Sequence, residues 1–319
     1  MFRFTNDEIN LSTLNGRNGF TINGASTYDY SGSFVSDAGD INGDGFDDII
    51  VGAVLSSDSG MFNYAVESYV VFGKASGFDA SFNLAELNGN NGFTINRIRG
   101  FYTGGSVSSA GDVNGDGFND LIIGAPGADP NGLESAGESY VIFGRDFTNK
   151  VTRQGTTGND LLLGTNDDDI LVGGLGNDTI RGGAGRDVLI GGAGNDVLSY
   201  GAIDRRLDGG SGTDTLAVDI SGVNIDLTTT PNNRITGIEI IDLAGTGNNT
   251  LKLTRLDLLD LSETTNQLIV KGNTGDAVTS TLQGWSDRGT TNFGGVLYDR
   301  YTSGAATLLI DTDITQTIS

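Results

Sequence analysis

Short apolar runs alternate with turns rich in Gly, Asn and Asp through the first half of the chain. Asp48–Val51 and Ser68–Phe72 are two of these runs, and both are rich in β-branched or aromatic residues. Short runs of this composition, bounded by turn residues, predict β-strands. Because this half shows no sustained spacing of about 3.6 residues, which an amphipathic helix requires, we expect strands and turns throughout it.

Two copies of a unit of roughly 72 residues account for this pattern. Three segments of the first copy recur in the second with few changes. Leu14–Asn23 recurs as Leu87–Asn96, Gly39–Phe46 as Gly111–Phe118, and Glu67–Gly73 as Glu138–Gly144. Repetition at such a period is typical of a solenoid, a propeller or an array of modules.

A second repeat, with a period of nine, runs for seven units from Gly155 to Ala217. Its eighth position is aliphatic in every unit: Leu162, Leu171, Ile180, Leu189, Leu198, Leu207 and Leu216. Its sixth position is Asp with one exception: Asp160, Asp169, Asp178, Asp187, Asp196, Arg205 and Asp214. A Gly/Asp-rich linker of low complexity would not keep so strict a phase, so we interpret this segment as a folded ladder.

Residues 218–319 show no obvious repeat, but apolar and polar residues alternate in short runs such as Ile238–Leu243. Such alternation predicts strands. Thr254–Ser262 is the one stretch there for which we expect a short helix. The patterns divide the chain into the paired repeats at 1–150, a linker at 151–154, the nonapeptide ladder at 155–217 and a β-rich domain at 218–319. We therefore expect an all-β protein.

The amino-acid composition excludes several classes of function. The 319 residues include no Cys and no His, which excludes disulfides, thiolate nucleophiles, Ser-His-Asp triads and the common zinc sites. With 41 acidic and 18 basic residues the net charge is −23, which argues against nucleic acid or an anionic membrane surface as partner. The charge favours hard cations bound by oxygen. The sequence shows neither an N-terminal secretory signal nor an apolar run long enough to span a membrane.

The first candidate sites are two loops with the same spacing of oxygen-bearing residues. Asp, Asn, Asp and Asp stand at positions 1, 3, 5 and 9, Gly at position 6 permits a sharp turn, and position 7 can offer its carbonyl. Calcium takes about six to eight oxygen ligands, most of which such a loop supplies locally. The candidates are Asp40, Asn42, Asp44, Phe46 and Asp48, and then Asp112, Asn114, Asp116, Phe118 and Asp120.

Two other interpretations of these loops are weaker. A pair of polar β-turns without metal would hold three carboxylates together, and these would repel one another without a cation. An EF-hand needs Glu at position 12 and flanking helices. Position 12 is Val51 or Ile123, inside an apolar run, so each loop leads into a strand.

Residues 5–150 resemble FG-GAP repeats, which build the integrin-alpha-type β-propeller. The resemblance rests on Phe72-Gly73 and Phe143-Gly144, together with Gly52-Ala53 and Gly124-Ala125-Pro126. It implies a calcium loop in a hairpin of each blade, with the two sets of loop residues above as ligands. That family's propeller has seven blades, and closed propellers have about four or more. Two units therefore predict either a piece of a longer chain or a pair of blades that forms an oligomer.

The nonapeptide units resemble the GGxGxDxUx pattern of calcium-binding repeats-in-toxin (RTX) proteins, which form a parallel β-roll. Gly at positions 1, 2 and 4 permits positive φ and close backbone approach, so turn carbonyls and the position-6 Asp can surround a cation. The position-8 aliphatic points inward. Besides the six Asp residues, the candidate ligand turns contain Gly173, Gly174, Gly176, Gly182, Gly183, Gly185, Gly191, Gly192, Gly194, Gly209, Gly210 and Gly212.

In the resembled fold two nonapeptides make one coil, and calcium bridges units n and n+2. This implies three sites along Asp160, Asp178, Asp196 and Asp214, and one between Asp169 and Asp187. Arg205 should abolish or weaken the next. Thr156 and Thr165, which replace Gly at position 2, mark the first two units as caps. With the two loops, we expect calcium at two FG-GAP sites and about four β-roll sites.

The resemblance also implies how the protein is used. RTX proteins typically leave Gram-negative bacteria by type I secretion through an uncleaved C-terminal signal, and the acidic, hydroxyl-rich Ile310–Ser319 is compatible with one. We expect the roll to stay unfolded in calcium-poor cytosol and to fold outside the cell. Residues 218–319 are similar to the C-terminal regions of bacterial RTX surface proteins.

We therefore expect a secreted, non-catalytic, calcium-binding adhesion or interaction protein, whose partner is a cell-surface protein or a glycan. One alternative is an accessory portion of a secreted hydrolase whose catalytic domain lies outside this chain, because FG-GAP repeats accompany hydrolases such as the GPI-specific phospholipase D family. Another is a structural spacer in a surface layer or matrix. The sequence offers no catalytic residues and no cofactor site besides calcium.

Overall fold

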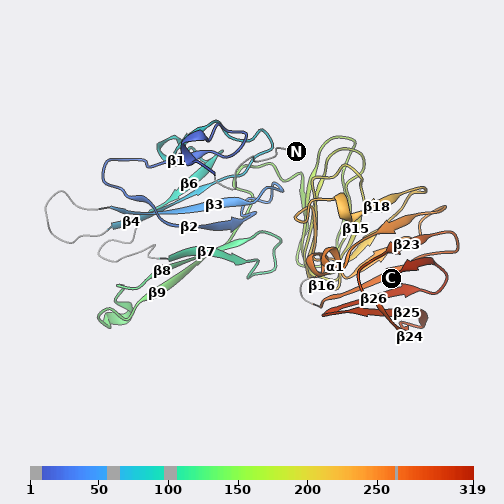
Figure 1. Ribbon diagram of the computed structural model, residues 1–319. Helices are drawn as coiled ribbons and strands as arrows, with labels where there is room; N and C mark the ends of the chain where they lie inside the picture. Colours follow the sequence, from blue (N-terminus) through green and yellow to red (C-terminus); the bar gives the residue numbers. More distant parts are fainter. Residues whose placement is uncertain (1–8, 56–64, 97–105, 263–264) are drawn as a thin grey trace. The chain divides into compact units, whose positions relative to one another are not determined.

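The structure is a computed structural model that describes residues 9–55, 65–96, 106–262 and 265–319. Residues 1–8, where the sequence shows no secretory signal, lie outside this part. The described residues are almost all in strands and turns, with one α-helix, which confirms the all-β prediction. The chain forms an N-terminal unit that ends at Asn149 and a C-terminal unit that contains Lys150–Ser319 together with Asn114–Gly117 (Figure 1).

The N-terminal unit contains two antiparallel sheets, one from each long repeat. Blade 1 has the order β2-β3-β4-β6, with β2 at Ser31–Gly39, β3 at Asp48–Leu55, β4 at Ala65–Val71 and β6 at Gly92–Ile95. Blade 2 has the order β7-β8-β9, with β7 at Ser106–Gly111, β8 at Asp120–Ala125 and β9 at Glu138–Ile142. The runs expected as strands from the sequence lie in β3 and β4. The two Asp/Asn loops connect β2 to β3 and β7 to β8.

A third, two-stranded sheet joins segments far apart in sequence. β1 (Thr21–Asn23) pairs in parallel with β5 (Ser81–Asn83), with Ile22 opposite Phe82. Short 3-10 turns precede β1 and β6, at Leu11–Thr13 and Leu84–Glu86, and a third lies at Pro130–Gly132. The blades pack face to face through apolar side chains of both sheets: Ala38, Ile41, Ile50, Val70 and Phe72 with Val107, Leu121 and Ile123.

The nonapeptide ladder forms two parallel sheets. One contains β10 (Arg153–Gln154), β12 (Ile170–Leu175), β14 (Val188–Gly194), β16 (Arg206–Gly212) and β19 (Ile235–Thr236). The other begins with β11 (Leu161–Leu163), β13 (Thr179–Arg181), β15 (Val197–Ser199) and β17 (Thr215–Ala217). Leu162 lies opposite Ile180, and Leu198 opposite Leu216, so the chain returns to the same face every 18 residues (180 − 162 = 18). Two nonapeptides therefore make one coil, as the resemblance implied.

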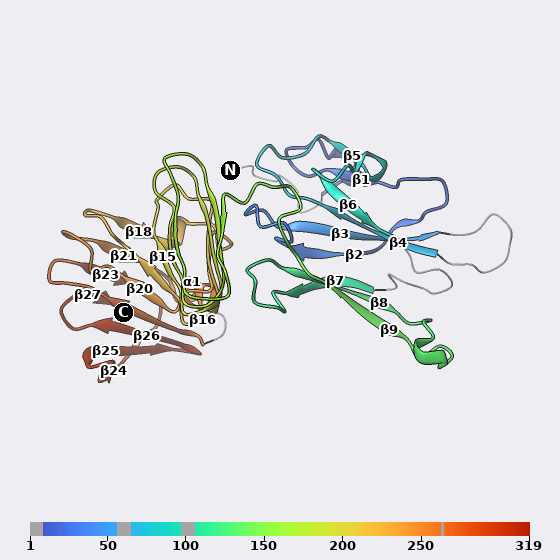
Figure 2. The same cartoon turned by 180° about the vertical axis from the view of Figure 1, so that it is seen from behind.

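The coil continues beyond residue 218 with longer and unequal turns. β20 (Ile240–Asp242), β22 (Gln267–Lys271) and β26 (Ala306–Asp311) extend the second sheet, which ends with the antiparallel β25 (Val296–Ser303) and β24 (Ser286–Phe293). A further parallel sheet, visible in Figure 2, contains β18 (Asn224–Asp226), β21 (Thr250–Lys252), β23 (Ala277–Ser280) and β27 (Thr315–Ile318). One apolar core, from Leu162 to Ile314, fills the whole stack.

The helix α1 spans Arg255–Leu261, which confirms the short helix expected there. Thr254 caps its first turn: the Thr254 hydroxyl accepts the amide N–H of Asp257, and the Asp257 carboxylate accepts the amide N–H of Thr254. Such a reciprocal pair satisfies two backbone donors that a helix start would otherwise leave unpaired. Leu258 and Leu261 then face the core.

Candidate metal centres

The loop between β2 and β3 gathers its oxygen-bearing side chains inside the protein. Asp40, Asn42, Asp44 and Asp48 are each at most 5% exposed. The Asp40 carboxylate accepts the amide N–H of Asp44 at 3.0 Å and that of Gly45 at 2.7 Å. Asn42 Oδ1 also accepts the Asp44 N–H, at 2.9 Å. The loop therefore curls around its own acidic side chains, which a strand connection without a ligand does not require.

Asp48 closes this loop at the start of β3. Its Oδ2 accepts the N–H of Ile41 at 3.1 Å, and its Oδ1 accepts the N–H of Gly73 at 2.8 Å. Burial, together with the nearby charges of Asp40 and Asp44, raises the pKa of Asp48 to about 9. A buried carboxylate beside other carboxylates is costly unless a cation offsets the charge.

Glycine is required where the loop turns. Gly43 and Gly45 have φ of +72° and +82°, a region that other residues rarely adopt. A Cβ on Gly43 would lie 2.5 Å from the ring of Phe118. Gly115 and Gly117 repeat the same backbone in the second loop, with φ of +76° and +88°. The Asn-Gly-Asp-Gly sequence thus specifies the turn as well as the oxygen atoms.

The loop between β7 and β8 uses the same hydrogen-bond frame. Asp120, fully buried, accepts the N–H of Val113 at 2.8 Å and that of Gly144 at 2.9 Å, as Asp48 does in the first loop. Asn114 Oδ1 accepts the N–H of Asp116 at 3.1 Å. The loops differ in exposure, because Asp112 lies exposed whereas its counterpart Asp40 is buried. Hydrogen bonds thus join positions 1, 3 and 5 in the first loop and positions 3 and 5 in the second, and position 9 closes both loops.

In the roll, the position-6 carboxylates form a ladder that is only half satisfied. In each case Oδ1 accepts the backbone N–H of the Asp one coil earlier. These pairs are Asp178 with Asp160 at 2.7 Å, Asp196 with Asp178 at 2.7 Å, Asp214 with Asp196 at 2.7 Å, and Asp187 with Asp169 at 2.9 Å. The second oxygen, Oδ2, of Asp178, Asp187, Asp196 and Asp214 is buried and has no hydrogen-bond partner among the described residues.

The Oδ2 atoms of Asp178, Asp187 and Asp196 each lie against a glycine where a Cβ would not fit. A Cβ on Gly173 would lie closer than 3.0 Å to Asp178 Oδ2, and equally close to the carbonyl oxygen of Gly191 in the next coil. The same holds for Gly191 with Asp196 Oδ2. A carboxylate oxygen and a carbonyl oxygen from adjacent coils thus face one small space. This donor set suits calcium, which prefers oxygen ligands.

Burial is the largest cause of a raised pKa in each of these four carboxyl groups. It raises the pKa of Asp178 and Asp187, and it raises that of Asp196 to about 6. The pKa of Asp214 is raised to about 8, mainly by burial and also by the charges of Asp196 and Glu239. Because each shift disfavours the charged form, a cation at the ladder would restore ionisation and release protons.

The first two units end the ladder with hydrogen bonds. Asp160 Oδ2 accepts both the N–H and the hydroxyl of Thr156, at 2.7 and 2.8 Å. Asp169 Oδ2 accepts the same two groups of Thr165, at 2.6 and 2.9 Å. These bonds lower the pKa of Asp160. The Thr residues that interrupt the glycine pattern thus satisfy the outermost carboxylates, as expected of caps.

At the sixth unit the structure uses residues that the nonapeptide pattern does not mark. Asp204, one position before Arg205, takes the place of the missing carboxylate, because its Oδ1 accepts the N–H of Asp187 at 3.3 Å. Burial raises the pKa of Asp204 to about 6. The Arg234 guanidinium donates to the carbonyl oxygens of Asp204 and Gly201, both at 2.7 Å. A cationic side chain therefore holds the turn carbonyls here.

Glu239 ends the other edge of the ladder. Its Oε2 accepts the N–H of Asp214 at 2.9 Å, and its Oε1 accepts the hydroxyl of Ser262 at 3.2 Å. Burial raises its pKa. The nine-residue phase could not reveal Glu239, because the coil after Asp214 is longer. An Asp next to the broken position was the available signal for Asp204.

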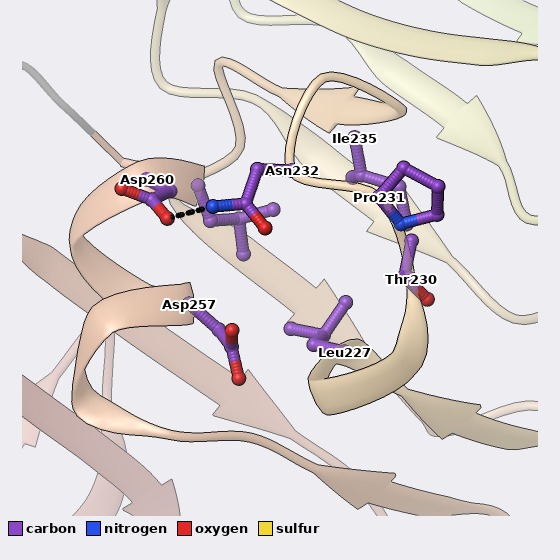
Figure 3. Close-up of a pocket in the computed structure, with 8 residues that line it drawn as sticks. Leu227, Thr230, Pro231, Asn232, Ile235, Asp257 and Asp260 are labelled. Atoms are coloured by element: carbon purple, nitrogen blue, oxygen red, sulfur yellow. Dashed lines mark hydrogen bonds between the residues drawn. The ribbon is translucent and has the colours of Figure 1, made fainter. Parts of the chain in front are cut away.

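A small hollow lies between α1 and the 3-10 turn at Leu227–Thr229 (Figure 3). Two carboxylates line it, but Asp257 caps the helix and Asp260 accepts a hydrogen bond from Asn232 Nδ2 at 2.5 Å. Its free volume is about 20 Å³, roughly the space of a single water molecule. Both carboxylates therefore have structural hydrogen-bond partners.

No described helix is long and apolar enough to cross a membrane. No group of three or more Asp, Glu, His or Cys in the described ranges is already arranged as a metal-binding cluster. The ligand sets above combine carboxylate oxygens with amide and carbonyl oxygens.

Comparison with known families identifies both repeats. The model described as FG-GAP repeat matches residues 35–62 and 103–142, and the model described as RTX calcium-binding nonapeptide repeat matches residues 154–180 and 172–202. The chain therefore contains FG-GAP repeats followed by RTX repeats, as the motifs predicted. The RTX repeats imply calcium binding, and both kinds of repeat are typical of extracellular, non-catalytic modules of the adhesion or interaction class.

Two curated proteins are similar to part of this chain. The chain is 34% identical over 169 residues to "Integrin alpha ina-1" of Caenorhabditis elegans. It is 31% identical over 156 residues to "Phosphatidylinositol-glycan-specific phospholipase D" of Dictyostelium discoideum. These alignments cover 50% and 46% of this chain but only 14% and 16% of the relatives. The chain thus spans a small part of each relative's length.

Proposed function

We propose that this protein is a secreted, non-catalytic adhesion or interaction protein whose folding is completed by calcium outside the cell. One observation carries the proposal: four carboxylate oxygens of the roll are buried without a hydrogen-bond partner among the described residues. Leaving a buried charged acceptor unsatisfied costs several kcal/mol in general. A sequence that repeats this arrangement four times is selected for a cation.

The four oxygens suggest how many cations the roll takes. They belong to Asp178, Asp187, Asp196 and Asp214, one for each of the about four inter-coil sites that the sequence predicts. The remaining ligands are carbonyls of the glycine turns. With one site in each FG-GAP loop, we propose about six calcium ions per chain. Calcium bound there supplies positive charge that neutralises the buried carboxylates and links successive coils.

The energetic effect is large enough to decide folding. At free calcium tenfold above Kd, each site adds about 1.4 kcal/mol of stability. Four roll sites together add roughly 6 kcal/mol, which is comparable to the stability of a whole domain. Extracellular calcium modules bind near 10⁻⁴ to 10⁻³ M, about the concentration outside cells and far above that inside. The roll therefore folds after export, for which we propose type I secretion.

The similarity to an integrin alpha chain supports adhesion, with a cell-surface protein or a glycan as partner. The similarity to a phospholipase D supports a second function, in which this chain is the accessory portion of a secreted hydrolase. The two proposals differ in whether a catalytic domain lies outside these residues. A binding screen of the calcium-loaded protein against cell-surface glycans and cells supports the first if a partner is retained and lost with EGTA.

Isothermal calorimetry and circular dichroism of the full chain test the calcium proposal. The expected result is about six bound calcium ions, with a gain of β-signal during titration that magnesium does not reproduce. Asp196→Asn should lower the stoichiometry, whereas Asp313→Asn, at an exposed turn, should not. A chain that is fully ordered in EGTA and binds no calcium would refute the proposal.

A further inference from the structure

The two blades are not equally complete. In blade 1, the sheet continues past β4 to β6, with Tyr69 opposite Thr94. In blade 2, β9 is the counterpart of β4, but among the described strands none pairs with its outer edge (Figure 1). An open edge of this kind is a template for another strand.

One face of blade 2 also exposes apolar side chains whose counterparts in blade 1 are buried. Ile122, Val141 and Phe143 are 39%, 45% and 54% exposed. Their counterparts in blade 1 are Ile50, Val70 and Phe72, which are 0%, 0% and 3% exposed because they pack against blade 2. Blade 2 thus presents the surface with which one blade contacts the next, but no described blade follows it.

Blade 1 also exposes an apolar side chain whose counterpart in blade 2 is buried between the blades. Val107 of blade 2 is 9% exposed, because it packs into the contact between the blades. Its counterpart in blade 1, Val35, is 67% exposed. Blade 1 therefore exposes the surface that corresponds to the one with which blade 2 contacts blade 1. Blade 2 exposes the surface that corresponds to the one with which blade 1 contacts blade 2. The exposed surface of blade 1 in one copy is therefore complementary to the exposed surface of blade 2 in another copy, whereas neither surface is complementary to itself.

The chain also contains a second copy of the missing strand. Residues 10–23 fold as residues 83–96 do: Gly16 N–H donates to Gly19 O at 2.9 Å, as Gly89 N–H does to Gly92 O at 3.0 Å. The glycine φ values agree as well, at +86° and +134° in the first segment and +89° and +136° in the second. β1 thus has the conformation of β6.

Aromatic contacts place the two segments alike on the blade that follows each. Phe20 stacks on Phe78 with ring centroids 4.1 Å apart, and Phe93 stacks on Phe147 at 4.7 Å. The Lys74 ammonium lies over the ring of Phe78, and the Arg145 guanidinium lies over the ring of Phe147. The difference is that β6 also pairs with β4, whereas β1 pairs with β5 and with no other described strand.

We propose that copies of this chain associate head to tail, with β1 of one copy as the fourth strand of blade 2 of the next. β1 then pairs with β9 as β6 pairs with β4, which sets Thr21 opposite Tyr140 and Phe20 opposite Val141. Blade 1 of the first copy covers the exposed Phe143 of the second. Because the contact joins two different surfaces, it repeats until a ring closes. Propellers have about four to eight blades, so two to four copies of two blades each complete one.

Light scattering of the full chain in calcium tests this assembly. The wild type should exceed the monomer mass of 33.1 kDa and approach two to four times that mass as its concentration rises. Val35→Lys and Val141→Lys each place a charge on one exposed half of the contact, so each variant alone should be monomeric. Mixed, they retain one intact contact and should form a dimer only. Leu133→Lys, at a side chain 62% exposed elsewhere in the unit, should associate like the wild type.

A monomeric wild type at all concentrations, or variants that associate as it does, would overturn the proposal. Crosslinking tests the strand register, because the chain has no Cys of its own. A mixture of Thr21→Cys and Tyr140→Cys should give a disulfide-linked dimer, since paired strands bring Cα atoms within about 7 Å. Thr21→Cys mixed with Leu133→Cys should not. Equal crosslinking of both mixtures would refute the β1–β9 pairing.

Discussion

Asp196→Asn should change stability in opposite directions with and without calcium. The Asn retains an Oδ1 that can accept the N–H of Asp178, which Asp196 now accepts at 2.7 Å. It removes a carboxylate whose pKa burial raises to about 6. In EGTA at pH 8 the wild type must bury that charge, whereas the variant does not. We therefore expect the variant to be as stable as the wild type or more stable when calcium is absent.

In calcium the sign reverses, because Asp196 lies between two predicted sites. At tenfold excess over Kd, the loss of one or both sites removes about 1.4 to 3 kcal/mol. For a unit of this size, about 1 kcal/mol corresponds to roughly 2–4 °C in Tm, so Tm should fall by about 3–12 °C. Scanning calorimetry in calcium and in EGTA measures both effects, with Asp313→Asn as the control. The same change in Tm under both conditions would refute the assignment of Asp196 as a calcium ligand.

Three further predictions concern acidity, the loop glycines and the end of the ladder. The pKa values of Asp48 and Asp214, raised to about 9 and about 8, mean that the folded metal-free chain binds more protons than the unfolded chain above pH 4. Its Tm in EGTA should therefore fall as pH rises from about 5 to 9, and saturating calcium should flatten this dependence. Gly43→Ala adds a Cβ 2.5 Å from an aromatic ring, whereas Gly77→Ala, also at positive φ, meets no described atom within 4 Å. In urea unfolding both should destabilise, the second by about 1 kcal/mol and the first by about 2–4 kcal/mol. Arg234→Ala leaves two turn carbonyls without their charged donor and should cost about 2–3 kcal/mol, whether or not calcium is present.

The sequence was most informative where turn chemistry is local. The Asn-Gly-Asp-Gly turns and the nine-residue phase are set by glycine φ values and by side chains within a few residues. They predicted both loops and the six position-6 Asp residues, whereas the coil of two nonapeptides was implied by the resemblance to RTX repeats. Asp204, Arg234 and Glu239 could not be found in this way. Asp204 stands one position out of phase in the sixth unit, and Arg234 and Glu239 lie in the longer coil after Asp214. Their partners are therefore fixed by tertiary packing and not by the nine-residue spacing.

The blades show a second limit of sequence patterns. Val35 and Val107 occupy equivalent positions in the repeat, yet their exposed fractions are 67% and 9%. Repetition shows that two residues share a local conformation, but not whether a neighbour covers both. The end positions of a repeat array differ from the inner ones, because each unit buries its face only against the next. That difference is visible only in the folded chain.

Within the C-terminal unit, calcium dependence should be confined to the middle. Thr156 and Thr165 satisfy the first carboxylates, and Arg234 and Glu239 hold the last coil, all without a metal. Beyond the ladder the same apolar core continues through Ile241, Leu268, Leu308 and Ile310, which are all fully buried. Among the described residues after 217, no buried carboxylate oxygen lacks a hydrogen-bond partner. This part therefore has a core that requires no cation.

Hydrogen exchange of the full chain in EGTA measures the difference. Amides of 173–217 should exchange rapidly, because four unsatisfied carboxylates destabilise their coils. Those of β22 and β26 should remain protected. Calcium should slow exchange in the first region by at least the factor of ten that one site at tenfold excess provides, and should leave the second nearly unchanged. Uniform protection across both regions in EGTA would show that packing alone holds the ladder, and the buried oxygens would then need another explanation.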